Sequence, residues 1–206
     1  MKPIPFPRAA PAAFLVLAAG MLATPMARAE QVNDATAPFT VNTRLNFRVV
    51  YPAFLRFRVG AAGATINLLD FTVPAAQVGS GTAVAATGGD AGPSAVNIEV
   101  AGTNGQVTIT PTNSSGGLGI GTGTASDGRI NYNQIGTTTS AGQLPAPVLT
   151  NAGGAPVTPT LNSALVTQRT AVWTYSYLNQ TVPSAGIYGG VGPANGGRVT
   201  YTATMP

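Results

Sequence analysis

Acidic side chains are the residues of this chain that could carry catalysis or hold a cation. There are six of them, and the chain contains no histidine and no cysteine. A Ser-His-Asp triad, a cysteine nucleophile and an ordinary zinc site are therefore excluded, because each needs a residue type that is missing. A carboxylate pair for glycoside hydrolysis, or a calcium site built from oxygen ligands, stays open on residue type alone. The six acids are Glu30, Asp34, Asp70, Asp90, Glu99 and Asp127.

None of these acids stands in a recognisable motif. Asp90 follows two glycines and Asp127 precedes one, with no Asp-x-Asp spacing and no EF-hand loop. Acids in such settings are typical of turns and of solvated surfaces. We therefore predict no catalytic residue, no metal ligand and no bound cofactor, and a protein that is not an enzyme.

Three aromatic residues alternate along one stretch near the end of the chain, namely Trp173, Tyr175 and Tyr177. A period of two puts them on one face of a strand. Such a row can offer an aromatic contact to a sugar, or it can pack in a protein core. Core packing is the more frequent role, and the sequence favours it here.

The sequence gives little support for a site that binds anionic ligands. Four arginines cluster at positions 44, 48, 56 and 58, but they alternate with apolar residues, which favours a polar strand face over an anion site. The glycine-rich run at 116–123 lacks the lysine and the strand-to-helix context of a phosphate loop, and is interpreted as a flexible connector.

The first 29 residues have the pattern of a secretory signal peptide. Lys2 and Arg8 precede an apolar run, and Ala27-Arg28-Ala29 offers small residues before a predicted cleavage at Glu30. The strongest part of the run, at 12–22, is shorter than the ~20 residues of a membrane span. We predict export to the periplasm and then to the cell surface or medium, with no integral membrane segment after cleavage. A retained membrane anchor is the alternative.

Cleavage would change the charge balance of the chain. Residues 30–206 hold seven arginines, no lysine and six acids, so the formal charge is +1 rather than +4. Such a balance predicts no nucleic-acid partner, since phosphate binding needs clustered cations. Without cysteine, stability must come from strand pairing and apolar burial.

The longest alternating stretch of the chain is residues 39–51. Its odd positions are apolar apart from Thr43, and its even positions are mostly polar or basic. This period predicts a long strand whose odd row is buried. Phe47→Asp should then destabilise the fold by several kcal/mol, whereas Arg48→Asp should cost little. The polar residues 30–38 before it are predicted to form a flexible N-terminal arm.

Further strands are predicted wherever apolar residues alternate between turn signals. Asn104-Gly105 predicts a tight hairpin between two of them. No stretch after residue 29 keeps a helical period, so the fold class is all-β: one antiparallel immunoglobulin-like sandwich at 30–206, with little or no helix. Strands are predicted at 54–59, 64–73, 96–100, 107–110, 129–135, 147–149, 165–178, 184–188 and 198–205.

A signal peptide, a cysteine-free β-domain and alternating strands at both ends together resemble subunits of chaperone–usher pili. The likeness lies in residues 39–51 and 197–206. In that family an immunoglobulin-like fold lacks one strand, and the N-terminal extension of the next subunit pairs into the gap. The resemblance implies association with copies of itself or other surface subunits, assisted by a periplasmic chaperone and an outer-membrane usher. The residues that would pair are Phe39, Val41, Leu45, Phe47 and Val49.

Two features depart from the pilin pattern. Residues 30–38 are too polar to be the donor segment, which places that role on residues 39–51. The number of predicted strands is also sufficient for a complete sandwich.

The sequence thus predicts a non-enzymatic, exported structural or adhesive surface protein, a fimbrial or pilus-like subunit that associates by strand pairing. A self-complete secreted sandwich that acts as an adhesin is one alternative. A carbohydrate-binding module or an exported carbohydrate-active enzyme is another. A sugar-binding module would expose Trp173 or Tyr177 beside an acid, and a complete sandwich would have paired or protected edge strands.

Overall fold

The computed structural model describes residues 30–122 and 128–206, and the chain divides into two units after Val50. The predicted signal peptide lies outside the described residues. The second unit, Tyr51–Pro206, carries all the strands that the structure describes. Within the described residues, no helix has both the length and the apolar character needed to cross a membrane.

The larger sheet is antiparallel throughout. Thr174 pairs with Ala95 of one neighbouring strand and with Thr138 of the other, so these two neighbours lie on opposite edges of a central strand. A two-residue strand continues the first of these edges. The sheet contains, in spatial order, β1 (Leu55–Val59), β3 (Ala95–Gly102) extended by β2 (Val84–Ala85), the central β8 (Thr167–Tyr177), and β5 (Ile135–Thr139).

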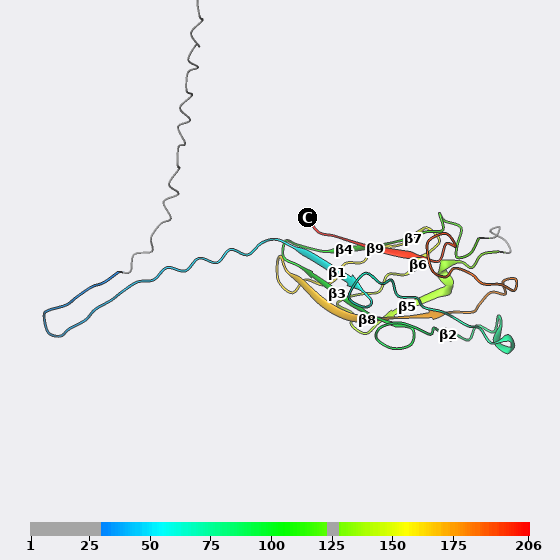
Figure 1. Ribbon diagram of the computed structural model, residues 1–206, viewed down its shortest axis with the longest axis horizontal. Coiled ribbons are helices and arrows are strands. Elements are labelled where there is room, and N and C mark those ends of the chain that lie inside the picture. Colours follow the sequence, from blue (N-terminus) through cyan, green and yellow to red (C-terminus); the bar gives the residue numbers. More distant parts are fainter. Residues whose placement is uncertain (1–29, 123–127) are drawn as a thin grey trace, which may run out of the picture. The chain divides into compact units, whose positions relative to one another are not determined.

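The second layer of the sandwich is the antiparallel pair β4 (Thr108–Asn113) and β9 (Val199–Thr204) (Figure 1). A small pair, β6 (Leu149–Thr150) and β7 (Gly153–Gly154), forms a ladder of its own and packs against β4. The helical content of the described residues is limited to two single turns, η1 (Ala75–Gln77) and η2 (Tyr132–Gln134). The predicted all-β antiparallel sandwich is confirmed.

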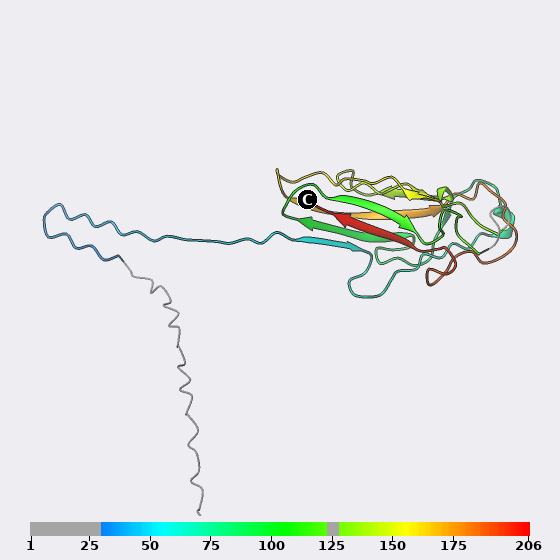
Figure 2. The same cartoon turned by 90° about the horizontal axis from the view of Figure 1, so that it is seen from above.

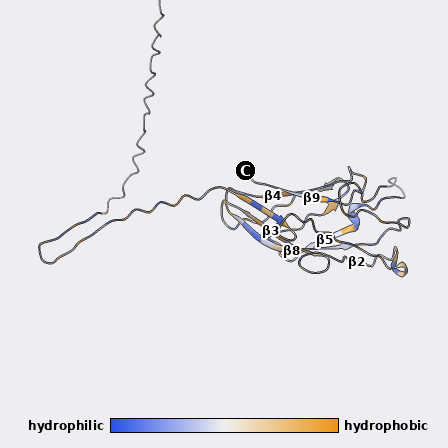
Figure 3. Ribbon diagram, in the orientation of Figure 1, coloured by the Kyte–Doolittle hydropathy of each residue, from blue (hydrophilic) through white to orange (hydrophobic). Residues whose placement is uncertain are grey.

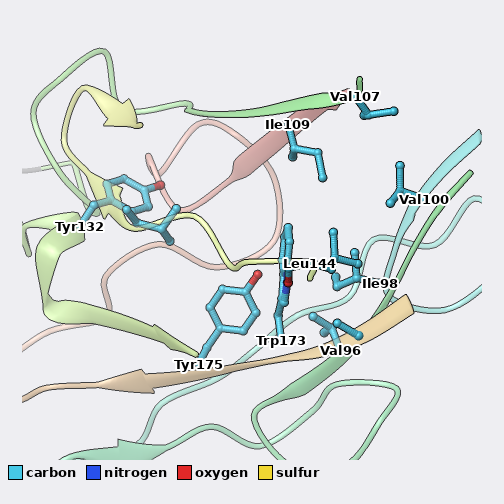
Figure 4. Close-up of a cluster of buried hydrophobic side chains, with 11 residues drawn as sticks. Val96, Ile98, Val100, Val107, Ile109, Tyr132, Leu144, Trp173 and Tyr175 are labelled. Carbon is cyan, nitrogen blue, oxygen red and sulfur yellow. The ribbon is translucent and has the colours of Figure 1, made fainter. Parts of the chain in front are cut away.

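The core lies between the two layers and is built from the inward-facing row of each strand (Figure 4). Trp173 is fully buried at its centre, its indole N–H donates to the carbonyl of Leu144, and its ring centroid lies 5.4 Å from that of Tyr201. Polar and apolar residues alternate along much of β8 and β9 (Figure 3). The β3 and β4 members of this core are Val96, Ile98, Val100 and Ile109.

Several predicted strands are wrong. Residues 64–73 form no strand and contribute only a bridge from Asp70 to Thr87, and residues 184–188 form none either. The segment predicted at 129–135 forms the turn η2 before β5 begins at Ile135. These short apolar runs between glycines and prolines have a period of two, but no neighbouring strand pairs with them. A strand does not form without a hydrogen-bonding partner.

The predicted hairpin at Asn104-Gly105 is also wrong. The strands on either side belong to different layers, because β3 pairs with β1 and β8 whereas β4 pairs with β9. Gly105 supplies the positive φ of 131° that the crossing requires, and its N–H donates to the carbonyl of Leu165. The dipeptide does mark a reversal of the chain, but this reversal connects strands of two different sheets. It does not connect two neighbouring strands of the same sheet.

Residues 39–51 do not form the predicted buried strand. Of these, 39–50 belong to the first unit, adopt no regular secondary structure and expose their side chains. Leu45, Phe47 and Val49 are 76%, 85% and 87% exposed, so the odd row is not buried. A strand needs a backbone partner, and the described residues offer none to this segment. The arm before the domain therefore spans residues 30–50 instead of 30–38.

Contacts within the arm involve its polar residues. The guanidinium of Arg44 donates to both carboxylate oxygens of Glu30, at 3.1 and 2.6 Å, and lowers the pKa of that carboxyl. Asp34 accepts from the backbone N–H groups of Thr40 and Thr36, which lowers its pKa as well. These exposed interactions contribute little free energy, and they leave the apolar row uncovered.

The tyrosines that pack in or against the core predict a loss of stability in alkali. Burial raises the pKa of Tyr132 and of Tyr175 from 10.0 to about 12, and raises that of Tyr201 well above 10.0. The folded state thus holds these protons at a pH where the unfolded chain releases them. The free energy of unfolding should stay level from neutral pH up to about pH 10 and fall between pH 10 and about 12, as measured by urea denaturation. A value unchanged at pH 11.5 would contradict these assignments.

Candidate functional site

The outer edge of β9 has no strand partner among the described residues. β4 occupies one edge of β9, and the other edge presents the unpaired backbone groups of the strand. The strand itself, Val-Thr-Tyr-Thr-Ala-Thr, contains no charge and no proline. Folded proteins usually protect a free edge with charges, proline or a bulge, because such an edge pairs readily with another chain. β9 has neither charged residues nor proline to protect its outer edge.

The order of the strands identifies what is missing beside β9. A constant-type immunoglobulin fold has seven strands, with the first, second, fifth and fourth in one sheet and the third, sixth and seventh in the other. With the two-residue strands set aside, β1, β3, β8 and β5 match the first sheet, and β4 and β9 match the third and sixth. No strand of the described residues occupies the seventh position, which would pair with β9.

The core is incompletely covered along the same side. Val100 and Ile109 are fully buried, whereas their ladder partners Phe57 on β1 and Ala203 on β9 are only half-buried. On the opposite flank Leu144 and Leu149 are buried, so that side is covered. We refer to the unpaired edge of β9 with its neighbouring half-buried side chains as the β9 edge; these side chains are Phe57, Val59, Tyr201, Ala203 and Met205.

The β9 edge is suited to binding an extended polypeptide. Its free backbone groups can pair with a strand, and its apolar side chains can pack against every second residue of that strand. β1 and β9 run in opposite directions here (Figure 2), with the end of β9 beside the start of β1, where Gly102 lies between Met205 and Leu55. The edge carries no titratable group other than the phenol of Tyr201, whose hydroxyl hydrogen-bonds that of Tyr175 at 2.9 Å.

All five residues predicted to pair with another subunit lie in the arm and are exposed. Beyond the three already described, Phe39 is 68% and Val41 48% exposed. The sequence identified this segment as amphipathic and extended, but assigned its apolar row to the core of its own domain. The β9 edge was missed altogether: residues 198–205 were predicted as a strand, but an unpaired edge is a property of the sheet order.

Two acidic residues of the second unit, Glu99 and Asp90, accept hydrogen bonds and have lowered pKa values. Glu99 accepts hydrogen bonds from Arg56 and Arg58, at 2.5 and 3.2 Å, and the Arg56 contact foremost lowers its pKa. Burial raises the pKa of Asp90, but hydrogen bonds from Asn97 outweigh it and the net shift is downward. A general acid needs a raised pKa, so neither carboxyl suits that role.

No group of three metal-ligating side chains occurs within 30–122 and 128–206, and Asp127 lies outside these residues. Arg56 and Arg58 are engaged by Glu99, so the arginine cluster predicted from the sequence is partly neutralised on β1.

The aromatic row of β8 lies in the core. Trp173, Tyr175 and Tyr177 are 0%, 6% and 5% exposed, so their ring faces are closed to a sugar ligand. This placement agrees with core packing rather than with a stacking platform.

Comparison of the chain with protein-family models, with curated proteins and with solved structures found no match.

Proposed function

We propose that this protein is a non-enzymatic, exported structural subunit of the cell surface that associates by strand pairing. The apolar row of residues 39–51 from one copy pairs with the β9 edge of another copy and supplies the seventh strand of its sandwich. A periplasmic chaperone would cover the β9 edge before assembly, and an outer-membrane usher would deliver the subunit to the surface. Other surface subunits with the same edge could accept the same segment.

One observation carries the proposal: the described residues of the domain provide no strand for the outer edge of β9, and the arm holds an unpaired segment with the alternation such a strand needs. Pairing would direct Leu45, Phe47 and Val49 onto the half-buried side chains of the β9 edge. The even positions, among them Arg44 and Arg48, would face solvent. Each buried apolar side chain contributes about 1.5–3 kcal/mol, and backbone pairing adds to this.

A second copy suits this pairing better than the same chain does. Strands of an immunoglobulin-like sheet are antiparallel, so the seventh strand must run opposite to β9. β1 already runs opposite to β9, and only residues 51–54 connect the arm to β1 in sequence. A fold-back of the arm beside its own β1 would reverse its direction and place it parallel to β9. Supply from another copy satisfies the antiparallel arrangement without that conflict.

Deletion of residues 30–51 tests the proposal. The truncated chain should stay folded, alone or with a chaperone, and should not polymerise. A synthetic peptide of residues 39–51 should bind it and raise its melting temperature, because a ligand that binds only the folded state stabilises it. The matched control is the same peptide with Leu45 and Phe47 both replaced by Asp, which should not bind.

A different outcome would show that the protein is complete without a strand from another copy. If the full chain stays monomeric at high concentration, and the truncated chain unfolds without rescue by the peptide, the protein is a self-complete sandwich. In cells, electron microscopy of sheared surface material with mass spectrometry should locate this chain in fibres.

A further inference from the structure

We propose that assembly buries a second interface, in which the loop at 178–197 of the accepting copy packs into a hollow beside the start of β1 in the donating copy. The inference rests on the proposed function and adds a contact that strand pairing alone does not require. It follows from the direction of β9, the short connection between arm and domain, and the chemistry of the two surfaces.

The domain has two distinct ends. We call the end where β1 starts and β9 finishes the near end, and the opposite one, where β8 finishes and β9 starts, the far end (Figure 1). An arm that pairs antiparallel to β9 enters the accepting copy at its near end and leaves at its far end. The domain of the donating copy therefore begins beside the far end of the accepting copy.

The connection between arm and domain is too short to hold the two copies apart. Phe54 is fixed to its own domain, since its N–H donates to the Thr103 hydroxyl at 3.2 Å and its carbonyl accepts from the Thr103 N–H. The same hydroxyl donates to the carbonyl of Pro52. When pairing includes Val49, only residues 50–53 lie between the paired segment and this anchor, and they span at most about 18 Å. The near end of one copy must then face the far end of the next.

The far end presents an uncharged apolar loop. Residues 178–197 contain no acidic or basic side chain, and Val182, Ile187 and Val191 are 72%, 96% and 87% exposed. The loop is shaped by its own hydrogen bonds: the Tyr188 hydroxyl donates to the carbonyl of Ser184 at 2.6 Å, and the Asn195 amide donates to that of Gly189.

The base of this loop is fastened as well. The buried side chain of Asn179 accepts from the N–H of Gly79 at 2.9 Å and donates to the carbonyl of Gln77 at 2.6 Å. A loop ordered before binding loses little conformational entropy when it is buried, which favours its use as an interface.

The near end offers a hollow of matching character. It has a volume of about 420 Å³ and lies over the outward face of β1, β3 and β8. Its lining combines the apolar side chains of Phe54 and Val166 with the polar ones of Thr103 and Gln168, and its only charged side chain, Arg56, is already paired with Glu99. A loop without charged side chains that offers both apolar side chains and polar groups fits this mixed lining, and the hollow includes Phe54, the residue that anchors the connection to the domain.

The test is a full chain carrying both Ile187→Glu and Val191→Glu. The two side chains are exposed, so the melting temperature of the monomer should not change. Self-assembly, followed by light scattering and electron microscopy, should require roughly tenfold or more higher protein concentration, since charges would enter an apolar interface. Val148→Glu is the matched control, because Val148 is 68% exposed but belongs to neither surface, and it should assemble normally.

Binding of the 39–51 peptide separates this inference from the proposed function. It is measured in full chains kept monomeric by Phe47→Asp, with and without the loop substitutions. Equal peptide binding with weakened assembly supports the second interface. If the loop substitutions change neither peptide binding nor assembly, the second interface is wrong and strand pairing stands. The same conclusion follows if the loop variant loses peptide binding. If the chain with an intact loop does not bind the peptide, strand pairing is wrong and the second interface falls with it.

Discussion

Phe47→Asp should abolish self-assembly while leaving the stability of the monomer almost unchanged. Phe47 is 85% exposed in the arm, so the substitution removes no buried contact from the folded chain and should alter its free energy of unfolding by less than about 0.5 kcal/mol. In the assembled state the same side chain would lie on the half-buried row of the β9 edge, where a carboxylate has no partner. Pairing should weaken by roughly 100-fold or more, because burying an unpaired charge costs several kcal/mol.

Arg48→Asp is the matched control for this substitution. It adds an acid at the neighbouring position, whose side chain would point to solvent in the paired strand. Thermal denaturation of the monomer and sedimentation of the assembled protein measure the two effects separately. Equal inhibition of assembly by both variants would mean that charge, rather than the facing of the strand, governs association. A large drop in melting temperature for Phe47→Asp would instead place its ring in the core of its own domain.

Trp173→Ala should lower the free energy of unfolding by about 3–5 kcal/mol. The indole is fully buried between the layers, packs against Tyr201 and donates its N–H to the carbonyl of Leu144. The substitution opens a large cavity and leaves that carbonyl without its donor. The expected loss is a large fraction of the roughly 5–15 kcal/mol by which native domains are stable. Urea denaturation followed by tyrosine fluorescence or circular dichroism measures the effect.

Thr174→Ala is the control on the same strand. Thr174 points outward and is exposed, so its replacement should cost less than about 0.5 kcal/mol. If Trp173→Ala were tolerated as well as Thr174→Ala, the aromatic row would not form the centre of the core. Trp173→Ala should also displace Tyr201 on the β9 edge, because the Tyr201 ring packs against the indole.

Two stretches with the same apolar alternation, 165–178 and 39–51, have different structures. β8 has partners on both edges, and its alternation, predicted at 165–178, is realised at Thr167–Tyr177. The alternation at 39–51 is as regular, yet its first twelve residues form no strand. A period of two records which side chains are to be buried together, but it contains no information on the chain that supplies the partner.

Local chemistry was sufficient to determine the fold class. Alternating apolar residues, the scarcity of helical periods and the many turn residues predicted an antiparallel sandwich, and the structure confirms it. The sequence also determined that the acids occur outside any catalytic motif, because residue type and spacing alone decide that.

The tertiary structure alone decided which strands are neighbours. Asn104-Gly105 reverses the chain, but only the packing of two layers made it a crossing between sheets. The unpaired edge of β9 and the exposure of Phe47 likewise arise from contacts between residues far apart in sequence. Burial is a property of the whole chain, because a side chain is covered only when residues distant in sequence pack against it. The described residues of the domain supply β4 to one edge of β9 and no strand to the other.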